Sequence, residues 1–145
     1  MATVSEDFPF PCDRILQRAR EELARGLSQG DDLSVRVASA LAWLATTTVV
    51  DLLVGWSVDR MPRGVVLKEP MRVASLKGFG AVQLVEPFVA LQGLYVRGFI
   101  GGGGAAVAEQ LLRRAEVFVN AARAVRPKAA QVDEIPIEGL RIARD

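Results

Sequence analysis

The stretch Val37–Val58, VASALAWLATTTVVDLLVGWSV, holds one formal charge, Asp51, in 22 residues. A run of this kind is either the buried centre of a small domain or a segment that enters a bilayer, whose apolar core is about 30 Å thick. Its leucines and valines together favour membrane insertion by roughly 3–5 kcal/mol, whereas Asp51 alone costs about 2.5–3.5 kcal/mol and the hydroxyl side chains add to that cost. The balance favours a core element of a soluble protein, with membrane association as the alternative.

Composition agrees with one globular domain. Half of the 145 residues are hydrophobic and 24% are charged, which is typical of a folded chain at the commonest domain size. The single cysteine, Cys12, excludes an intramolecular disulfide and fits a reducing compartment, so we expect a cytoplasmic protein, with peripheral membrane attachment as the alternative. The mean hydropathy of +0.23 is high for a small soluble domain, and excess apolar surface often forms an interface.

Helical spacing of apolar residues predicts the first two elements. Asp13 is a plausible N-cap for a helix that runs to about Ser28. Gly30 then ends this helix, and the following aspartates cap a second helix over 33–58. This second helix has no polar stripe, so we expect it to be surrounded on all sides. Five β-branched residues over 46–50 leave a strand across 46–54 as the alternative.

The second half of the chain gives a weaker pattern. Pro70 and Pro87 could each occupy the first position of a helix, which predicts short helices over 70–85 and 87–99. Glycines in this region and short runs of β-forming residues leave the alternative of an α+β fold with short strands in 64–100. A final helix is expected from Ala105 to about Val125, with Pro127 ending it.

These elements predict a mainly α fold, a single-domain helical bundle over 13–126 with the apolar helix 33–58 at its centre. An N-terminal arm over 1–12 and a C-terminal arm over 127–145 flank the bundle, and the prolines of Phe8-Pro9-Phe10-Pro11 favour an extended N-terminal arm. Apolar side chains on both arms need a surface to dock on, and the interaction candidates are Phe8, Phe10, Ile135, Ile137 and Leu140, with Ile142 continuing the alternation. We expect docking on a neighbouring subunit, with folding back on the same domain as the alternative.

Charge is unevenly distributed along the chain. Residues 1–59 carry nine acids against five bases, and residues 60–126 carry ten bases against four acids. This polarity favours contact between unlike faces of two subunits, or else complementation within one fold. The bases form no dense cluster and accompany no nucleic-acid motif, so the pattern does not favour nucleic-acid binding.

Residue types exclude most common chemistries. The chain has no histidine, so it has no Ser-His-Asp or Cys-His arrangement and no imidazole ligand for zinc. One cysteine excludes the usual thiolate zinc and iron–sulfur sites. We therefore expect no catalytic residues, no metal site, no cofactor and no enzymatic activity.

Two features remain as candidate sites. Asp51 lies within an apolar helix and must be paired, hydrogen-bonded or protonated. Its role is either structural, as a buried pair or a residue at the edge of the surface, or functional, in a pocket or as a pH-dependent trigger. The run from Gly101 to Ala106 fits a G-x-G-x-x-A turn at Gly101, Gly103 and Ala106 if a strand precedes it, which would aim a helix N-terminus at a phosphate. A tight helix–helix connection is the other interpretation, and no second strand follows to complete a βαβ unit.

The pattern as a whole favours a non-enzymatic, self-associating helical protein that acts as a structural or adaptor subunit through protein–protein contacts. A helical bundle that binds or inserts into membranes is the first alternative. Nucleotide or phosphate binding at Gly101–Ala106 is the second.

Overall fold

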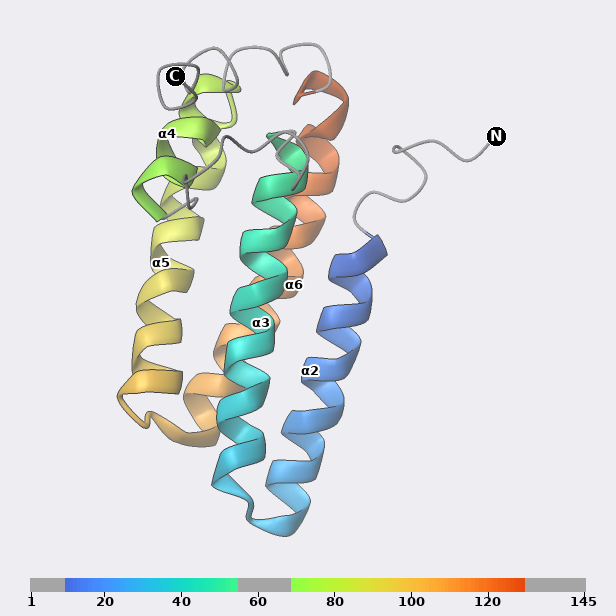
Figure 1. The fold of residues 1–145 in the computed structure, drawn as a ribbon, viewed down its shortest axis with the longest axis vertical. Helices are drawn as coiled ribbons and strands as arrows, with labels where there is room; N and C mark the ends of the chain where they lie inside the picture. Colours follow the sequence, from blue (N-terminus) through green and yellow to red (C-terminus); the bar gives the residue numbers. More distant parts are fainter. Residues whose placement is uncertain (1–9, 55–68, 130–145) are drawn as a thin grey trace, which may run out of the picture.

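The structure is a computed structural model that describes residues 10–54 and 69–129 (Figure 1). Within these residues the fold is a mainly α helical bundle, as predicted, and it contains no strand. The elements in chain order are α2 (Phe10–Gln29), α3 (Asp32–Leu53), α4 (Glu69–Gly78), the 3-10 turn η1 (Val82–Leu84), α5 (Val85–Tyr95), the π-helical turn η2 (Val96–Ile100) and α6 (Gly104–Ala129). The strand alternatives for 46–54 and for the described part of 64–100 are therefore not needed.

The long helices α2, α3, α5 and α6 run alternately up and down, with α3 at the centre (Figure 1). In this view α2 lies on one side of α3, α5 lies on the other, and α6 lies behind. The short α4 lies near the start of α5. The predicted central position of the apolar helix is thus confirmed.

The first helix starts earlier than the sequence predicts. α2 begins at Phe10, so Phe10 and Pro11 are helical rather than part of an extended arm, and Asp13 lies in the first turn rather than at the N-cap. In the first turn of a helix, the backbone N–H groups have no carbonyl acceptor within the helix. Pro11 has no N–H group, so it loses no hydrogen bond at this position. Phe8 and the rest of the N-terminal arm lie outside the described residues.

The connection between α2 and α3 follows the prediction closely. Gly30 adopts φ 65°, and the Asp31 N–H donates to the Gly26 carbonyl at 3.0 Å, which closes α2 with a Schellman motif. The Asp31 carboxylate then accepts from the Leu33 and Ser34 N–H groups as the N-cap of α3. One short sequence therefore ends one helix and starts the next.

The β-branched residues of α3 are accommodated within the helix. The Thr46 hydroxyl donates to the Ala42 carbonyl at 2.9 Å, and the Thr47 hydroxyl donates to the Leu44 carbonyl at 3.1 Å. These bonds satisfy two buried polar groups inside an apolar core. The helix ends at Leu53 with Val54 as its C-cap, and the predicted continuation over 55–58 lies outside the described residues.

Helix boundaries in the second half differ from the prediction. α4 stops at Gly78 rather than 85, because Gly80 adopts φ 75° and the Ala81 N–H donates back to the Leu76 carbonyl at 2.9 Å. Pro87 is the third residue of α5, not the first. α6 continues past Pro127 to Ala129, so Pro127 does not end the helix, and the C-terminal arm can begin no earlier than residue 130.

A chain of aromatic rings joins the helices at the core. The Trp43 ring of α3 lies 5.2 Å from the Phe88 ring of α5 and 5.5 Å from the Tyr95 ring, between centroids. The Phe88 ring in turn lies 6.1 Å from the Phe118 ring of α6. Offset and tilted ring pairs of this kind add about 0.5–1.5 kcal/mol each beyond area burial, so these contacts fix how α5 and α6 pack on α3.

Candidate interaction surfaces

The described helices do not surround α3 on all sides, which differs from the expectation from its composition. Leu33 is 68% exposed and Leu44 is 47% exposed, and Val37 and Leu41 between them are partly exposed. We call these four residues the open face of α3. Their spacing of three and four residues places them in one row along the helix, whereas α2, α5 and α6 cover its other sides.

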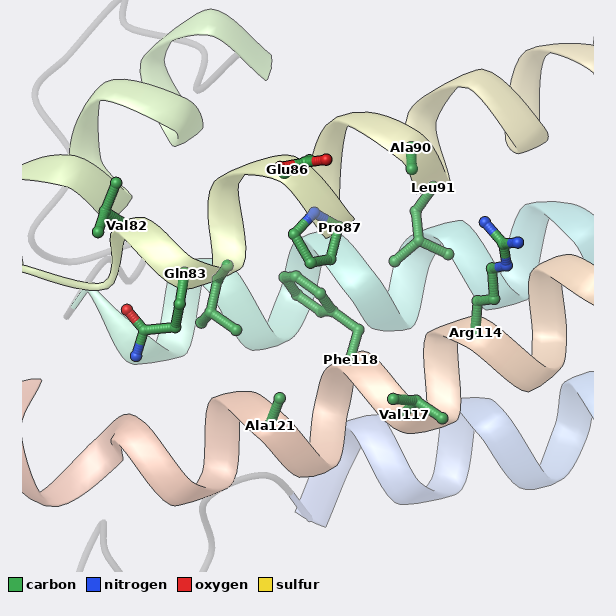
Figure 2. Close-up of a pocket in the computed structure, with 11 residues that line it drawn as sticks. Val82, Gln83, Glu86, Pro87, Ala90, Leu91, Arg114, Val117, Phe118 and Ala121 are labelled. Atoms are coloured by element: carbon green, nitrogen blue, oxygen red, sulfur yellow. The ribbon is translucent and has the colours of Figure 1, made fainter.

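A second apolar surface lies between α5 and α6 (Figure 2). This α5/α6 groove has a volume of about 620 Å³. Buried Leu84, Leu91 and Phe118 form its floor, and the more exposed members of its lining are Val82, Gln83, Glu86, Pro87, Ala90, Arg114, Val117 and Ala121. Val82 is 63% exposed and Val117 is 66% exposed, so the groove presents apolar walls to solvent.

The groove carries charge as well as apolar surface. Figure 2 shows Glu86 on the α5 wall and Arg114 on the α6 wall, with Val82 and Gln83 at the end away from Arg114. The groove thus offers one acidic and one basic group beside an apolar floor. A mostly apolar concavity with a few polar groups at its edge is the usual form of a binding site for a peptide or small molecule.

Asp51 forms an ion pair with Arg72 of α4. The Arg72 Nε donates to Oδ1 at 2.9 Å and its Nη2 donates to Oδ2 at 3.0 Å, and the two side chains are 25% and 14% exposed. The geometry is bidentate, which is the strongest arrangement of an arginine and a carboxylate. The geometry therefore favours the structural role of Asp51 as a member of an ion pair. This pair joins α4 to the C-terminal end of α3.

Cys12 is fully buried in the core. Burial, with a smaller contribution from the Asp13 carboxylate, raises the pKa of the Cys12 thiol to about 12. A thiol that stays protonated is a poor nucleophile. Among residues 10–54 and 69–129, no group of three or more carboxylates or thiols is placed to hold a metal ion.

The glycine run connects two helices rather than a strand and a helix. The residues before Gly101 belong to α5 and η2, so the strand that the nucleotide interpretation requires is replaced by helix. The Gly103 N–H donates to the Arg97 carbonyl at 2.6 Å, and a Cβ on Gly103 would lie 2.8 Å from that oxygen. Gly103 is therefore required by the close return of the chain, and Ala106 lies in the first turn of α6.

Ion pairs within the chain join some of the acids of its first half to bases of its second half. Asp13 of α2 accepts from Arg123 of α6 at 3.0 Å, and Asp51 pairs with Arg72, so acids of the first half meet bases of the second. Arg20 and Glu116 make a further pair between α2 and α6 in the opposite sense. Complementation within one fold, one of the two predicted explanations, thus accounts for the charges of these pairs.

The sequence did not indicate the α5/α6 groove. One signal was available, because Val117 is a large apolar residue off the buried stripe of the last helix. Ile135, Ile137 and Leu140, the remaining predicted interaction residues, lie outside the described residues, and the side chain of Phe10 is likewise not described.

No protein-family model, curated protein or solved structure matches this chain in the three comparisons made.

Proposed function

We propose that this protein is a non-enzymatic structural or adaptor subunit of the cytoplasm that associates with a second copy of itself through the open face of α3. The observation that supports this most directly is the exposure of Leu33 and Leu44 on α3, the apolar helix at the centre of the bundle. Contiguous apolar surface on a soluble domain is typical of an interaction site. The buried, protonated thiol of Cys12 and the lack of histidine support a non-catalytic role.

A second copy fits this face in spacing and in charge. Leucine and valine side chains at intervals of three and four residues can interdigitate with the same row of a like helix. Each end of the face carries an acid and a base already paired with each other, Asp32 with Arg36 at 3.1 Å and Asp51 with Arg72 at 2.9 Å. Two copies can therefore approach in an antiparallel, two-fold arrangement without like charges meeting.

Sedimentation velocity with light scattering tests the proposal. The wild-type protein is expected to have a mass above the 15.7 kDa of one chain, and Leu44→Glu is expected to return it to one chain, because a carboxylate on the open face would be buried in the interface without a partner. Val89→Glu is the matched control, since it changes an apolar residue of α5 with nearly the same exposure, 48% against 47%, that belongs neither to the open face nor to the α5/α6 groove. A wild-type protein that stays a single chain at tens of micromolar contradicts the proposal.

Membrane binding through the same face is the second candidate. α3 has 22 residues, and its most apolar window has a mean hydropathy of 1.5, enough by length and composition to cross a bilayer, although 61% of that window is buried within the bundle. Association would then place the open leucines against lipid. Co-sedimentation with neutral and anionic vesicles that is lost in Leu44→Glu would favour this candidate, and a protein that remains in the supernatant with both vesicle types rejects it.

A further inference from the structure

Arg114 places a positive charge at an apolar concave surface. Its side chain lines the α5/α6 groove, and its guanidinium points from α6 toward α5 (Figure 2). Within the described ranges 10–54 and 69–129, no ion pair or side-chain hydrogen bond joins Arg114 to another residue. The guanidinium is therefore available to an anion that enters the groove.

The groove has the size of a site for one small molecule. Its volume of about 620 Å³ lies within the range of roughly 300–1,000 Å³ that is usual for such sites. On α6 the lining runs from Arg114 to Ala121, which is a length of about 10 Å at 1.5 Å per residue. In Figure 2 Arg114 lies toward one end of the groove, and Val82 and Gln83 lie at the other end.

The polar groups of the lining limit the charge of a ligand. Besides Arg114, the charged member of the lining is Glu86, which is exposed and lies farther from α6 than Pro87 in Figure 2. A phosphate monoester carries a charge of about −1.5 to −2, so its second charge would be repelled by Glu86. A carboxylate carries a single negative charge, and its two oxygens match the fork of a guanidinium.

We propose that the α5/α6 groove binds a monocarboxylic acid with an unbranched apolar tail, such as a medium-chain fatty acid. The carboxylate accepts hydrogen bonds from the Arg114 guanidinium, and the tail runs over the buried floor from Leu91 toward Leu84. The groove is separate from the open face of α3, so the proposal does not rest on self-association.

The tail removes water from apolar surface that the fold leaves exposed. Val82 is 63% exposed and Val117 is 66% exposed, and both belong to the lining. Burial of one methylene group of a ligand raises the affinity roughly threefold to fourfold. An extended tail about as long as the groove thus supplies most of the affinity, and Arg114 sets the orientation.

Isothermal titration calorimetry of the full chain with hexanoate, octanoate and decanoate tests the proposal. One carboxylate is expected to bind per chain, with an affinity that rises roughly tenfold for each two methylene groups. Octanol, which has the tail of octanoate without its charge, is expected to bind about fivefold to tenfold more weakly than octanoate. Wild-type protein that does not bind decanoate, or that binds octanol as tightly as octanoate, overturns the proposal.

Two arginine variants test the position of the carboxylate. Arg114→Gln is expected to weaken decanoate binding about fivefold to tenfold, because it removes the charged donor. Arg113→Gln removes the same charge from the neighbouring residue of α6, which is exposed and does not line the groove, and it should leave binding unchanged. Equal losses in the two variants would mean that decanoate responds only to the net charge of the protein, which overturns the assignment to Arg114.

Two alanine variants test the position of the tail. Ala121 is an exposed residue of the groove wall, so Ala121→Trp fills the groove and should abolish decanoate binding without disturbing the core. Ala124→Trp places the same side chain at an exposed position of α6 outside the lining, and it should bind decanoate like wild type. Circular dichroism checks the helical content of each variant, and equal binding by the two variants overturns the placement of the tail.

A last variant separates this proposal from the proposed function. Leu44→Glu lies on the open face of α3 and is expected to change the mass of the protein while leaving decanoate binding intact. Loss of decanoate binding in Leu44→Glu would place the site at the open face of α3, which overturns the proposal for the groove. A protein that stays a single chain and still binds decanoate at Arg114 would contradict self-association alone.

Discussion

The buried thiol of Cys12 makes the stability of the fold depend on pH. Its folded-state pKa of about 12 lies above the ordinary value of 9.0, so the unfolded chain loses the thiol proton first as pH rises. The contribution of the protonated thiol to stability is therefore complete below about pH 9 and is lost between about pH 9 and 12. We expect the free energy of unfolding of wild type to fall relative to Cys12→Ala over this range in urea titrations. A difference between the two proteins that does not vary with pH would contradict the burial of the thiol.

For Asp51, the sequence predicts that the carboxylate needs a partner, but it does not predict which residue provides that partner. A carboxylate in an apolar run had to be paired, but the pairing with Arg72 depends on where α4 packs. Asp51→Asn is expected to lower the free energy of unfolding by about 1–3 kcal/mol, because it leaves the guanidinium with a weaker, neutral partner.

A double-mutant cycle with Arg72→Met measures the interaction itself. The loss in the double variant should be smaller than the sum of the two single losses, because the second substitution removes a group whose partner is already gone. Additive losses would mean that the two side chains do not stabilise each other.

At the scale of the helix, the approach of α2 to α3 depends on Gly26. A Cβ there would lie 2.6 Å from the Val35 Cγ2 atom and 2.9 Å from the Asp31 carbonyl oxygen. Gly26→Ala is expected to destabilise the protein by about 1–3 kcal/mol in thermal or urea unfolding, because the helices must separate. Gly93→Ala is the control, since a Cβ on this helical residue meets nothing within 4 Å, and it should stabilise the protein by about 0.5–1 kcal/mol. Equal effects of both substitutions would show that the helices do not approach as described.

The sequence predicted which segments are helical better than it predicted where the helices end. Periodic apolar residues and the Gly30-Asp31 connection were sufficient for α2, α3 and α6. Pro11 and Pro127 gave wrong boundaries, and the end of α4 before Gly80 was missed, because the effect of a proline or glycine depends on its position within a turn. Pro11 is compatible with the first turn, whereas Gly80 ends a helix only because its φ is positive.

The candidate surfaces could be predicted least. A helix that is apolar all round gives no sign of which side lacks a neighbour, so the exposure of Leu33 and Leu44 follows from how many helices surround α3. The α5/α6 groove depends on the packing of two helices whose exposed residues include both small and large apolar side chains. Both surfaces depend on how several helices pack together, so the residue pattern along one helix cannot predict them.

The order of the helices has a consequence for how the molecule folds. α2 and α3 are consecutive and in contact, and so are α5 and α6, so each of these two pairs can form early as a local helical hairpin. The slower event is then the docking of one hairpin onto the other. Trp43 belongs to the first hairpin, and its ring neighbours Phe88 and Tyr95 belong to the second. The surroundings of the Trp43 indole therefore change when the hairpins dock, not when either one forms. We expect the fluorescence of Trp43 to change in the last step of folding.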